Sequence, residues 1–193
     1  MGKTTKYHVA YANDFSASKE EKKAFKKQYH MPRYALMAKV FELFEEPVAE
    51  GNSRTPYAPF IKIEKDVVYK TIDGEDLVMD IYFPMEETNE PRPVVLVIPG
   101  GGWVIHNRYR RDGYARGFAT IGAVVAVIDH RLGPKVFFPE NLKDCIDAYN
   151  FLVDNADKYN LDVNNITVTG DSSGGHMTAC LGCASSSKEY VEN

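Results

Sequence analysis

The sequence lacks several features that would each indicate a specialised class of protein. It has no excess of positive charge, because 23 Lys and Arg face 27 Asp and Glu, for a net charge of −4. General nucleic-acid binders are normally basic, so we expect no nucleic-acid partner. No apolar run approaches the roughly 18 residues that span a membrane, and residues 1–23 contain no apolar signal core. We therefore expect a cytoplasmic protein that does not enter a membrane.

Cysteine is also scarce, with only Cys145, Cys180 and Cys183 in the chain. An odd number of cysteines without a secretion signal favours reduced thiols over a disulfide framework. Cys180 and Cys183 form a C-x-x-C pair, but a metal or redox role would need a second ligand pair or a thioredoxin-like context. We interpret them as small apolar residues of a packed helix and expect no metal and no cofactor.

The first 55 residues are expected to form a helical extension or cap. Ser18 and Glu21 have the spacing of a capping box, and the apolar residues after Pro32 recur at helical spacing. The basic residues 22–27 are interpreted as a solvated helix face, with binding to an acidic partner as the alternative. Turn-forming residues then break the pattern, so residues 56–193 are taken as a second unit.

The pattern of residues 56–193 predicts an α/β protein. Residues 61–71 and 77–84 alternate and flank an Asp-Gly turn, which indicates an antiparallel hairpin. Three later runs are apolar on both faces, as in parallel strands covered by helices on each side: 94–99, 123–129 and 166–170. The stretches between them have helical spacing: 109–122 and 139–160. We predict a mostly parallel sheet with an antiparallel N-terminal hairpin and helices on both faces.

Ser172 lies in a motif that can build a nucleophile. Residues 170–174 have the pattern G-x-S-x-G, directly after the third apolar run and before helix-forming residues. In that position the serine forms a sharp strand-to-helix turn at the carboxyl edge of the sheet. The next amide, that of Ser173, lies at a helix N-terminus, where negative charge is stabilised. A phosphate-binding loop or a plain tight turn is the alternative, although the lysine-bearing phosphate-loop pattern is absent.

A run of three glycines follows the first of the apolar runs. Gly100, Gly101 and Gly102 allow backbone amides to approach a ligand closely because no side chain intervenes. Beside the serine turn, these amides can supply further donors to a negatively charged oxygen. Trp103 comes next and is a candidate wall of the pocket, with ordinary core packing as the alternative.

The segment from Asp129 to Pro139 completes a resemblance to a known family. It reads D-H-R-L-G-P…F-P, and it accompanies P-G-G-G at residues 99–102 and G-D-S-S-G-G at residues 170–175. The combination resembles the hormone-sensitive-lipase-like branch of α/β-hydrolase esterases, which carry H-G-G-G, D-Y-R-L-A-P-E…F-P and G-D-S-A-G-G. Pro99 in place of the first histidine resembles the related carbohydrate acetyl and feruloyl esterases.

This resemblance implies an α/β-hydrolase fold and a serine esterase that cleaves short acyl esters, including acetyl groups on sugars, through an acyl-enzyme. It implies that Ser172 is the nucleophile. The oxyanion donors would be the amide of Ser173 and the glycine run, with Gly100 and Gly101 favoured. Asp129 and Arg131 would order the loop that follows their strand.

The partners that the serine needs are not evident. In α/β-hydrolases the acid and the histidine follow the serine on later strands, but the chain ends soon after the helix that begins at Ser172. We expect an incomplete fold that lacks both partners and is catalytically crippled. His106, after the glycines, is the best replacement base, whereas His130 and His176 are expected to serve packing or the surface.

An incomplete sheet would expose the strand at residues 166–170 as an apolar edge, which tends to pair with another chain. We expect self-association or a partner chain there. Two alternatives to an active esterase stay open: a module that binds a small ester or carboxylate without turnover, and a subunit whose acid and histidine come from a partner chain.

Overall fold

The computed structural model describes residues 60–105, 108–133 and 135–186, so the expected helical extension over residues 1–55 lies outside it, as does His106. The strands of the described part are β1 (Ile61–Ile72), β2 (Glu75–Pro84), β3 (Arg92–Ile98), β4 (Val124–Ile128) and β5 (Leu161–Gly170). Its helices are η3 (Arg108–Arg111), α4 (Asp112–Thr120), α5 (Glu140–Asp154), α6 (Ala156–Tyr159) and α7 (Ser173–Ser186).

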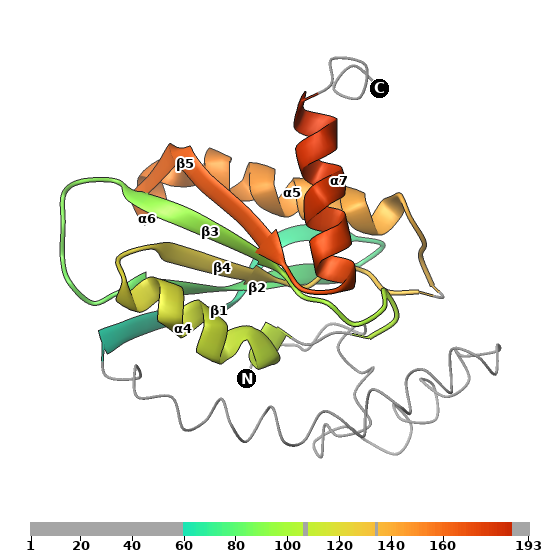
Figure 1. Cartoon of the computed structure of the whole chain (residues 1–193), viewed down its shortest axis with the longest axis horizontal. Coiled ribbons are helices and arrows are strands. Elements are labelled where there is room, and N and C mark those ends of the chain that lie inside the picture. Colours follow the sequence, from blue (N-terminus) through green and yellow to red (C-terminus); the bar gives the residue numbers. More distant parts are fainter. Residues whose placement is uncertain (1–59, 106–107, 134, 187–193) are drawn as a thin grey trace.

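The described strands form a single sheet in the order β1-β2-β4-β3-β5 (Figure 1). β1 pairs with β2 and β2 pairs with β4 in antiparallel fashion, whereas β3 is parallel to both β4 and β5. The predicted hairpin and the three predicted parallel strands are therefore confirmed. β5 is the outer strand among those described, as predicted, and the association of this edge with another chain stays a prediction.

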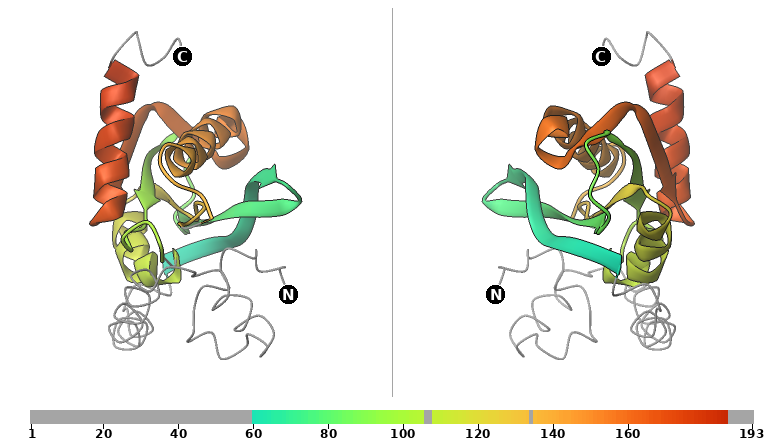
Figure 2. Two further views of the ribbon diagram at one scale, coloured as in Figure 1. Left: turned by 90° about the vertical axis from the view of Figure 1, so that its right-hand side faces the viewer. Right: turned by 90° about the vertical axis from the view of Figure 1, so that its left-hand side faces the viewer.

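Helices cover both faces of this sheet, as predicted. Figures 1 and 2 show α5 and α7 on one side and α4 on the other. Leu152 of α5 and Met177 of α7 pack into one apolar cluster with the sheet, while Ala115 and Ala119 of α4 pack into a second cluster on the opposite face. None of the described helices is both long enough and apolar enough to cross a bilayer.

Three local features differ from the sequence-based expectation. β2 is buried from Leu77 to Tyr82 without alternation, because both of its faces are covered: Met79 packs in one apolar cluster and Tyr82 in the other. The single helix expected over residues 139–160 is divided into α5 and α6 at Asn155, whose side-chain amide donates to the Phe151 carbonyl at 2.8 Å. β5 begins at Leu161, earlier than predicted, because this residue pairs with the first residue of β3.

The parallel strands bring the sequence motifs to one edge of the sheet. Ile98, the last residue of β3, pairs with Gly170, the last residue of β5. The glycine run and the serine turn therefore leave the sheet side by side, and Figure 1 shows α7 rising directly from the end of β5. Open α/β sheets bind their ligands at this carboxyl edge.

A buried ion pair fixes the loop after β4 against α5. Arg131 donates from Nε and Nη2 to the Asp144 carboxylate at 2.7 to 3.0 Å, and its own amide donates to the same carboxylate at 2.9 Å. Asp144 is fully buried. Arg131 thus has the structural role that the sequence analysis expected.

Replacing Asp144 should show how strongly this ion pair supports the fold. Asp144→Ala leaves a buried arginine without its carboxylate, so we expect the free energy of unfolding to fall by about 3–5 kcal/mol. The measurement is urea unfolding followed by circular dichroism. Lys143→Ala is the control, because the neighbouring Lys143 forms only an exposed ion pair with Glu140. Equal unfolding midpoints for the two variants would contradict the expectation.

Candidate active site

Ser172 lies on the tight turn that joins β5 to α7. Its φ is 49°, in the left-handed region that residues other than glycine rarely adopt, and its side chain is exposed. The turn is closed by hydrogen bonds from the Gly174 amide to the Asp171 carbonyl at 2.8 Å and from the His176 amide to the Ser172 carbonyl at 3.0 Å. Such strained residues cluster at functional sites, where the surrounding structure holds them in place.

The glycines on either side of Ser172 are required by the end of β3. A Cβ added to Gly170 would lie 2.5 Å from the Ile98 carbonyl oxygen, and one added to Gly174 would lie 2.0 Å from the same oxygen. Both distances are far below van der Waals contact. The turn can therefore approach β3 only because both positions lack a side chain.

Side chains of the turn hold the glycine loop in place. The Gly100 amide donates to Asp171 Oδ1 at 3.1 Å, and the Gly101 amide donates to Ser173 Oγ at 2.9 Å. Arg111 donates from Nε and Nη2 to the two oxygens of the same Asp171 carboxylate, each at 2.7 Å. The loop, the turn and η3 thus form one hydrogen-bonded unit.

The four residues predicted as oxyanion donors lie together in this unit, but their amides differ. Those of Gly100 and Gly101, which the resemblance favoured, are already donated to side chains. In the described part of the chain, the amides of Gly102 and Ser173 donate to no other group. The two latter amides are therefore the ones available to a ligand beside Ser172.

Trp103 lies at the surface next to these amides rather than in the core. It is 39% exposed and has a φ of 61°. Its ring is nearly perpendicular to that of His176 at a centroid distance of 5.4 Å, and the ring of Phe138 lies 6.2 Å from that of His176. These three rings form an exposed aromatic cluster beside the turn, and the role of Trp103 as a pocket wall stays a prediction. His176 has the surface position that was expected.

The described residues place no base on Ser172. Within them, the Ser172 hydroxyl has no hydrogen-bond partner. His130 is 1% exposed, and its Nδ1 lies 3.0 Å from the Arg131 carbonyl oxygen, which fits its expected structural role. His106, the predicted replacement base, lies outside the described residues.

The sequence of residues 79–193 matches the model of the BD-FAE family. The chain belongs to the BD-FAE family. It is 33% identical to esterase LipC of Mycobacterium tuberculosis over 125 residues, which cover 63% of this chain and 31% of LipC. It is 31% identical to the arylacetamide deacetylase of Bos taurus over 123 residues, which cover 61% of this chain and 31% of that protein.

Solved structures agree with this assignment of the BD-FAE chain. Esterase B from Lactobacillus rhamnosis, in an inhibited form, superposes with a TM-score of 0.70 and 26% sequence identity. The match covers 82% of this chain and 52% of esterase B. The fold is therefore that of the α/β-hydrolases, and the predicted relationship to hormone-sensitive-lipase-like esterases is confirmed. The chain spans between about a third and a half of the length of these relatives.

Arg108 organises a buried charge cluster that the sequence analysis of this BD-FAE chain missed. The side chain is 1% exposed; its Nε lies 2.9 Å from Asp80 Oδ1, and its Nη atoms donate to Asp129 and Asp66. Burial opposes its charge, but the carboxylates of Asp129 and Asp80 outweigh burial and raise the pKa of Arg108 above its ordinary value. The cluster ties the segment after the glycine loop to β1, β2 and the end of β4. A local pattern could not indicate it, because the three carboxylates come from distant segments.

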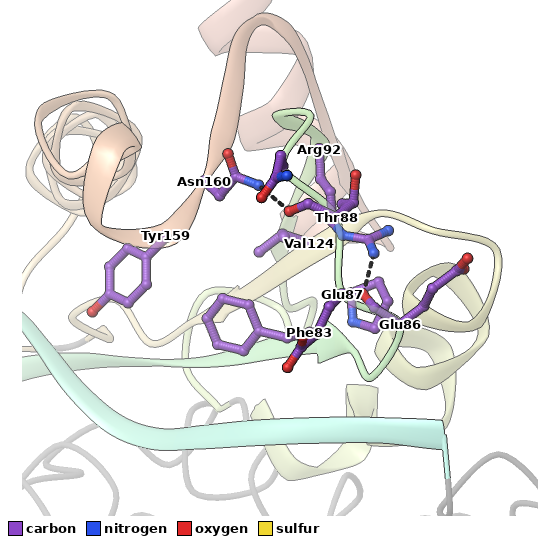
Figure 3. Close-up of a pocket in the computed structure, with 10 residues that line it drawn as sticks. Phe83, Glu86, Glu87, Thr88, Arg92, Val124, Tyr159 and Asn160 are labelled. Carbon is purple, nitrogen blue, oxygen red and sulfur yellow. Dashed lines mark hydrogen bonds between the residues drawn. The ribbon is translucent and has the colours of Figure 1, made fainter.

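One cavity of the BD-FAE chain lies away from Ser172. It has a volume of about 490 Å3 and lies at the amino ends of β3 and β4, where Arg92 and Val124 line it together with Phe83 and Tyr159 (Figure 3). A smaller cavity of about 160 Å3 adjoins the serine turn, between Arg111 and Gly170. Because α/β folds bind ligands at the carboxyl ends of their strands, the smaller cavity has the position expected of a ligand site. No group of three His, Cys, Asp or Glu suited to a metal ion occurs among the described residues.

Adding a methyl group at Gly174 should disrupt the turn. Gly174→Ala places a Cβ against the Ile98 carbonyl, so we expect a loss of at least about 2 kcal/mol in the free energy of unfolding, in the range of overpacked sites. Gly182→Ala on the same helix is the control, since no atom lies within 4 Å of its added Cβ. That variant should be neutral or more stable, because alanine favours a helix over glycine. Thermal unfolding of both variants is the measurement, and similar midpoints would contradict the close packing.

His130 should make the fold sensitive to acid. Burial lowers the pKa of His130 below its ordinary value. As the pH falls below about 6.5, the unfolded chain therefore takes up a proton before the folded chain does. Stability should fall with decreasing pH, by up to about 1.4 kcal/mol per pH unit from this group. Urea unfolding at pH 7.5, 6.5 and 5.5 measures this slope, and His130→Asn should reduce it. A variant with the wild-type slope would exclude His130 as the cause.

Proposed function

We propose that this chain carries the nucleophile and the oxyanion site of a carboxylic ester hydrolase that acts on short-chain esters. The observation that supports this function is the position of Ser172, exposed on a strained turn beside the amides of Gly102 and Ser173, which have no acceptor among the described residues. The esterases among its relatives support the same reaction class. Within the short-chain esters we propose acetylated sugars as substrates, since the aromatic cluster of Trp103, Phe138 and His176 offers flat faces beside the site.

The reaction proceeds in two steps through Ser172. Its Oγ attacks the carbonyl carbon of the ester while its proton passes to a base, and the bond to the alcohol oxygen then breaks as the alcohol leaves with that proton. Water attacks the resulting acyl-serine, releases the carboxylic acid and restores the hydroxyl. In both steps the negative charge develops on the former carbonyl oxygen.

The backbone around Ser172 stabilises this charge. The Ser173 amide begins α7, where the helix dipole favours an anion. The Gly102 amide comes from the neighbouring loop, which the hydrogen bonds of Asp171 and Ser173 hold against the turn. Fixed donors of this kind need no reorganisation during the reaction, which is why each contributes strongly to the rate.

A binding module that does not turn over its ligand is the second candidate. The observation that favours it is the lack of any hydrogen-bond partner for the Ser172 hydroxyl among the described residues. Without a base, the amides and the aromatic cluster would still hold a small ester or carboxylate. Of the histidines outside the described residues, His106 is the one that we propose as the base.

Hydrolysis of 4-nitrophenyl acetate tests the proposal. With His106 as the proposed base, we expect the full chain to release nitrophenol. We expect Ser172→Ala to abolish the release, because it removes the proposed nucleophile. Ser185→Ala, a serine on the exposed part of α7, is the control and should retain the wild-type rate. His106→Ala should lower the rate at least about 100-fold if it supplies the base.

Binding to the wild type and activity of the Ser172 variant separate the two candidate functions. Binding of the ester without turnover, seen by calorimetry in the wild type, would favour the binding module. Activity that persists in Ser172→Ala would exclude Ser172 as the nucleophile.

A further inference from the structure

The hydroxyl of Ser173 is bonded to an amide of the glycine loop that lies beside the serine turn. Ser173 Oγ accepts the Gly101 N–H at 2.9 Å, which is a normal hydrogen-bond length. Ser173 is 3% exposed, so water does not readily replace this contact. The side chain of Ser173 therefore occupies the Gly101 amide, whereas its own backbone amide remains available to a ligand.

A single N–H cannot serve two acceptors fully. When the Gly101 N–H is directed at Ser173 Oγ, an oxygen of the substrate can share it only in a weaker, bifurcated arrangement. If the Gly101 N–H turned from Ser173 Oγ to the substrate oxygen, the buried Ser173 hydroxyl would lose its donor, which costs free energy. An alanine at position 173 would present no such competitor.

We propose that the Ser173 hydroxyl withholds the Gly101 amide from the oxyanion, so that the site works with the amides of Gly102 and Ser173 alone. Ser173 is thereby a positioning residue whose side chain limits the reactivity of Ser172. This inference rests on the proposed esterase function.

The rest of the loop is fixed without Ser173. The Gly100 amide is bonded to Asp171, and Arg111 holds the same carboxylate. Further along, the Gly101 carbonyl accepts the Ile105 amide at 3.1 Å. Removal of one buried hydroxyl oxygen should therefore leave the loop in place and free the Gly101 N–H, rather than let the loop collapse.

The predicted effect is a gain of reactivity. One well-placed oxyanion donor changes the rate by roughly 100- to 1000-fold. The bonds from Gly100 to Asp171 and from Ile105 to Gly101 keep the loop in place when the Gly101 amide is freed. We therefore expect Ser173→Ala to accelerate the reaction of Ser172 by at least about tenfold, at the lower end of that effect. A variant that merely weakened the structure would lower the rate instead.

The experiment measures covalent labelling of Ser172 by a fluorescent alkyl fluorophosphonate, which requires no completed turnover. The nucleophile's oxygen displaces fluoride from phosphorus and its proton leaves with the fluoride, while negative charge develops on the phosphoryl oxygen. The full chain is compared as wild type, Ser173→Ala and Thr178→Ala. Thr178 is the matched control because its hydroxyl bonds within α7, to the Gly174 carbonyl at 3.0 Å. Ser172→Ala defines the background, and the exchange rate of the Gly101 amide is followed by NMR in the wild type and in Ser173→Ala.

Faster labelling and faster Gly101 amide exchange in Ser173→Ala, with wild-type labelling in Thr178→Ala, would support the inference. Equal or slower labelling in a folded Ser173→Ala would overturn it and leave the esterase proposal intact. Rapid exchange of the Gly101 amide in the folded wild type would overturn it even if Ser173→Ala failed to fold. Wild-type labelling no faster than that of Ser172→Ala would overturn the esterase proposal and this inference together.

Discussion

The contact between the serine turn and the end of β3 is the constraint on which the site depends. The Ile98 carbonyl lies so close to Gly170 and Gly174 that neither position can carry a side chain. This contact aligns the last residues of β3 and β5 and places the glycine loop against Ser172. Because the approach is set by packed backbone, the amides near the hydroxyl keep fixed positions without a ligand, which is what electrostatic stabilisation of a developing charge requires.

Arginines secure each loop that surrounds this contact. Arg108 binds three carboxylates beneath the segment that follows the glycines, Arg111 binds Asp171 on the turn itself, and Arg131 binds Asp144 beneath the loop after β4. The planar guanidinium can hold one or more carboxylates with several directed hydrogen bonds. Loops that would otherwise be mobile thus gain a rigid support, and a functional site depends on such support for its geometry.

Within this rigid frame, small changes of side chain can alter which backbone donors a ligand meets. The backbone amide of Ser173 is available to a ligand, while the hydroxyl of Ser173 accepts the hydrogen bond of the Gly101 amide. The same sequence motif can therefore present different numbers of donors, depending on one oxygen atom. In the proposed mechanism, the reactivity of Ser172 depends on this local competition as well as on the base that activates the hydroxyl.

The sequence by itself determined the strands, the hairpin, the serine turn and the glycine loop, because each is encoded by neighbouring residues through hydrophobic spacing and the need for glycine. The family resemblance added the identity of the fold. Only the tertiary structure decided the burial of β2, the partners of Arg108 and the hydrogen bond from Gly101 to Ser173. These features join segments that are far apart in the chain, as Gly101 and Ser173 are, and their geometry arises only when the strands pair and the loops between them pack.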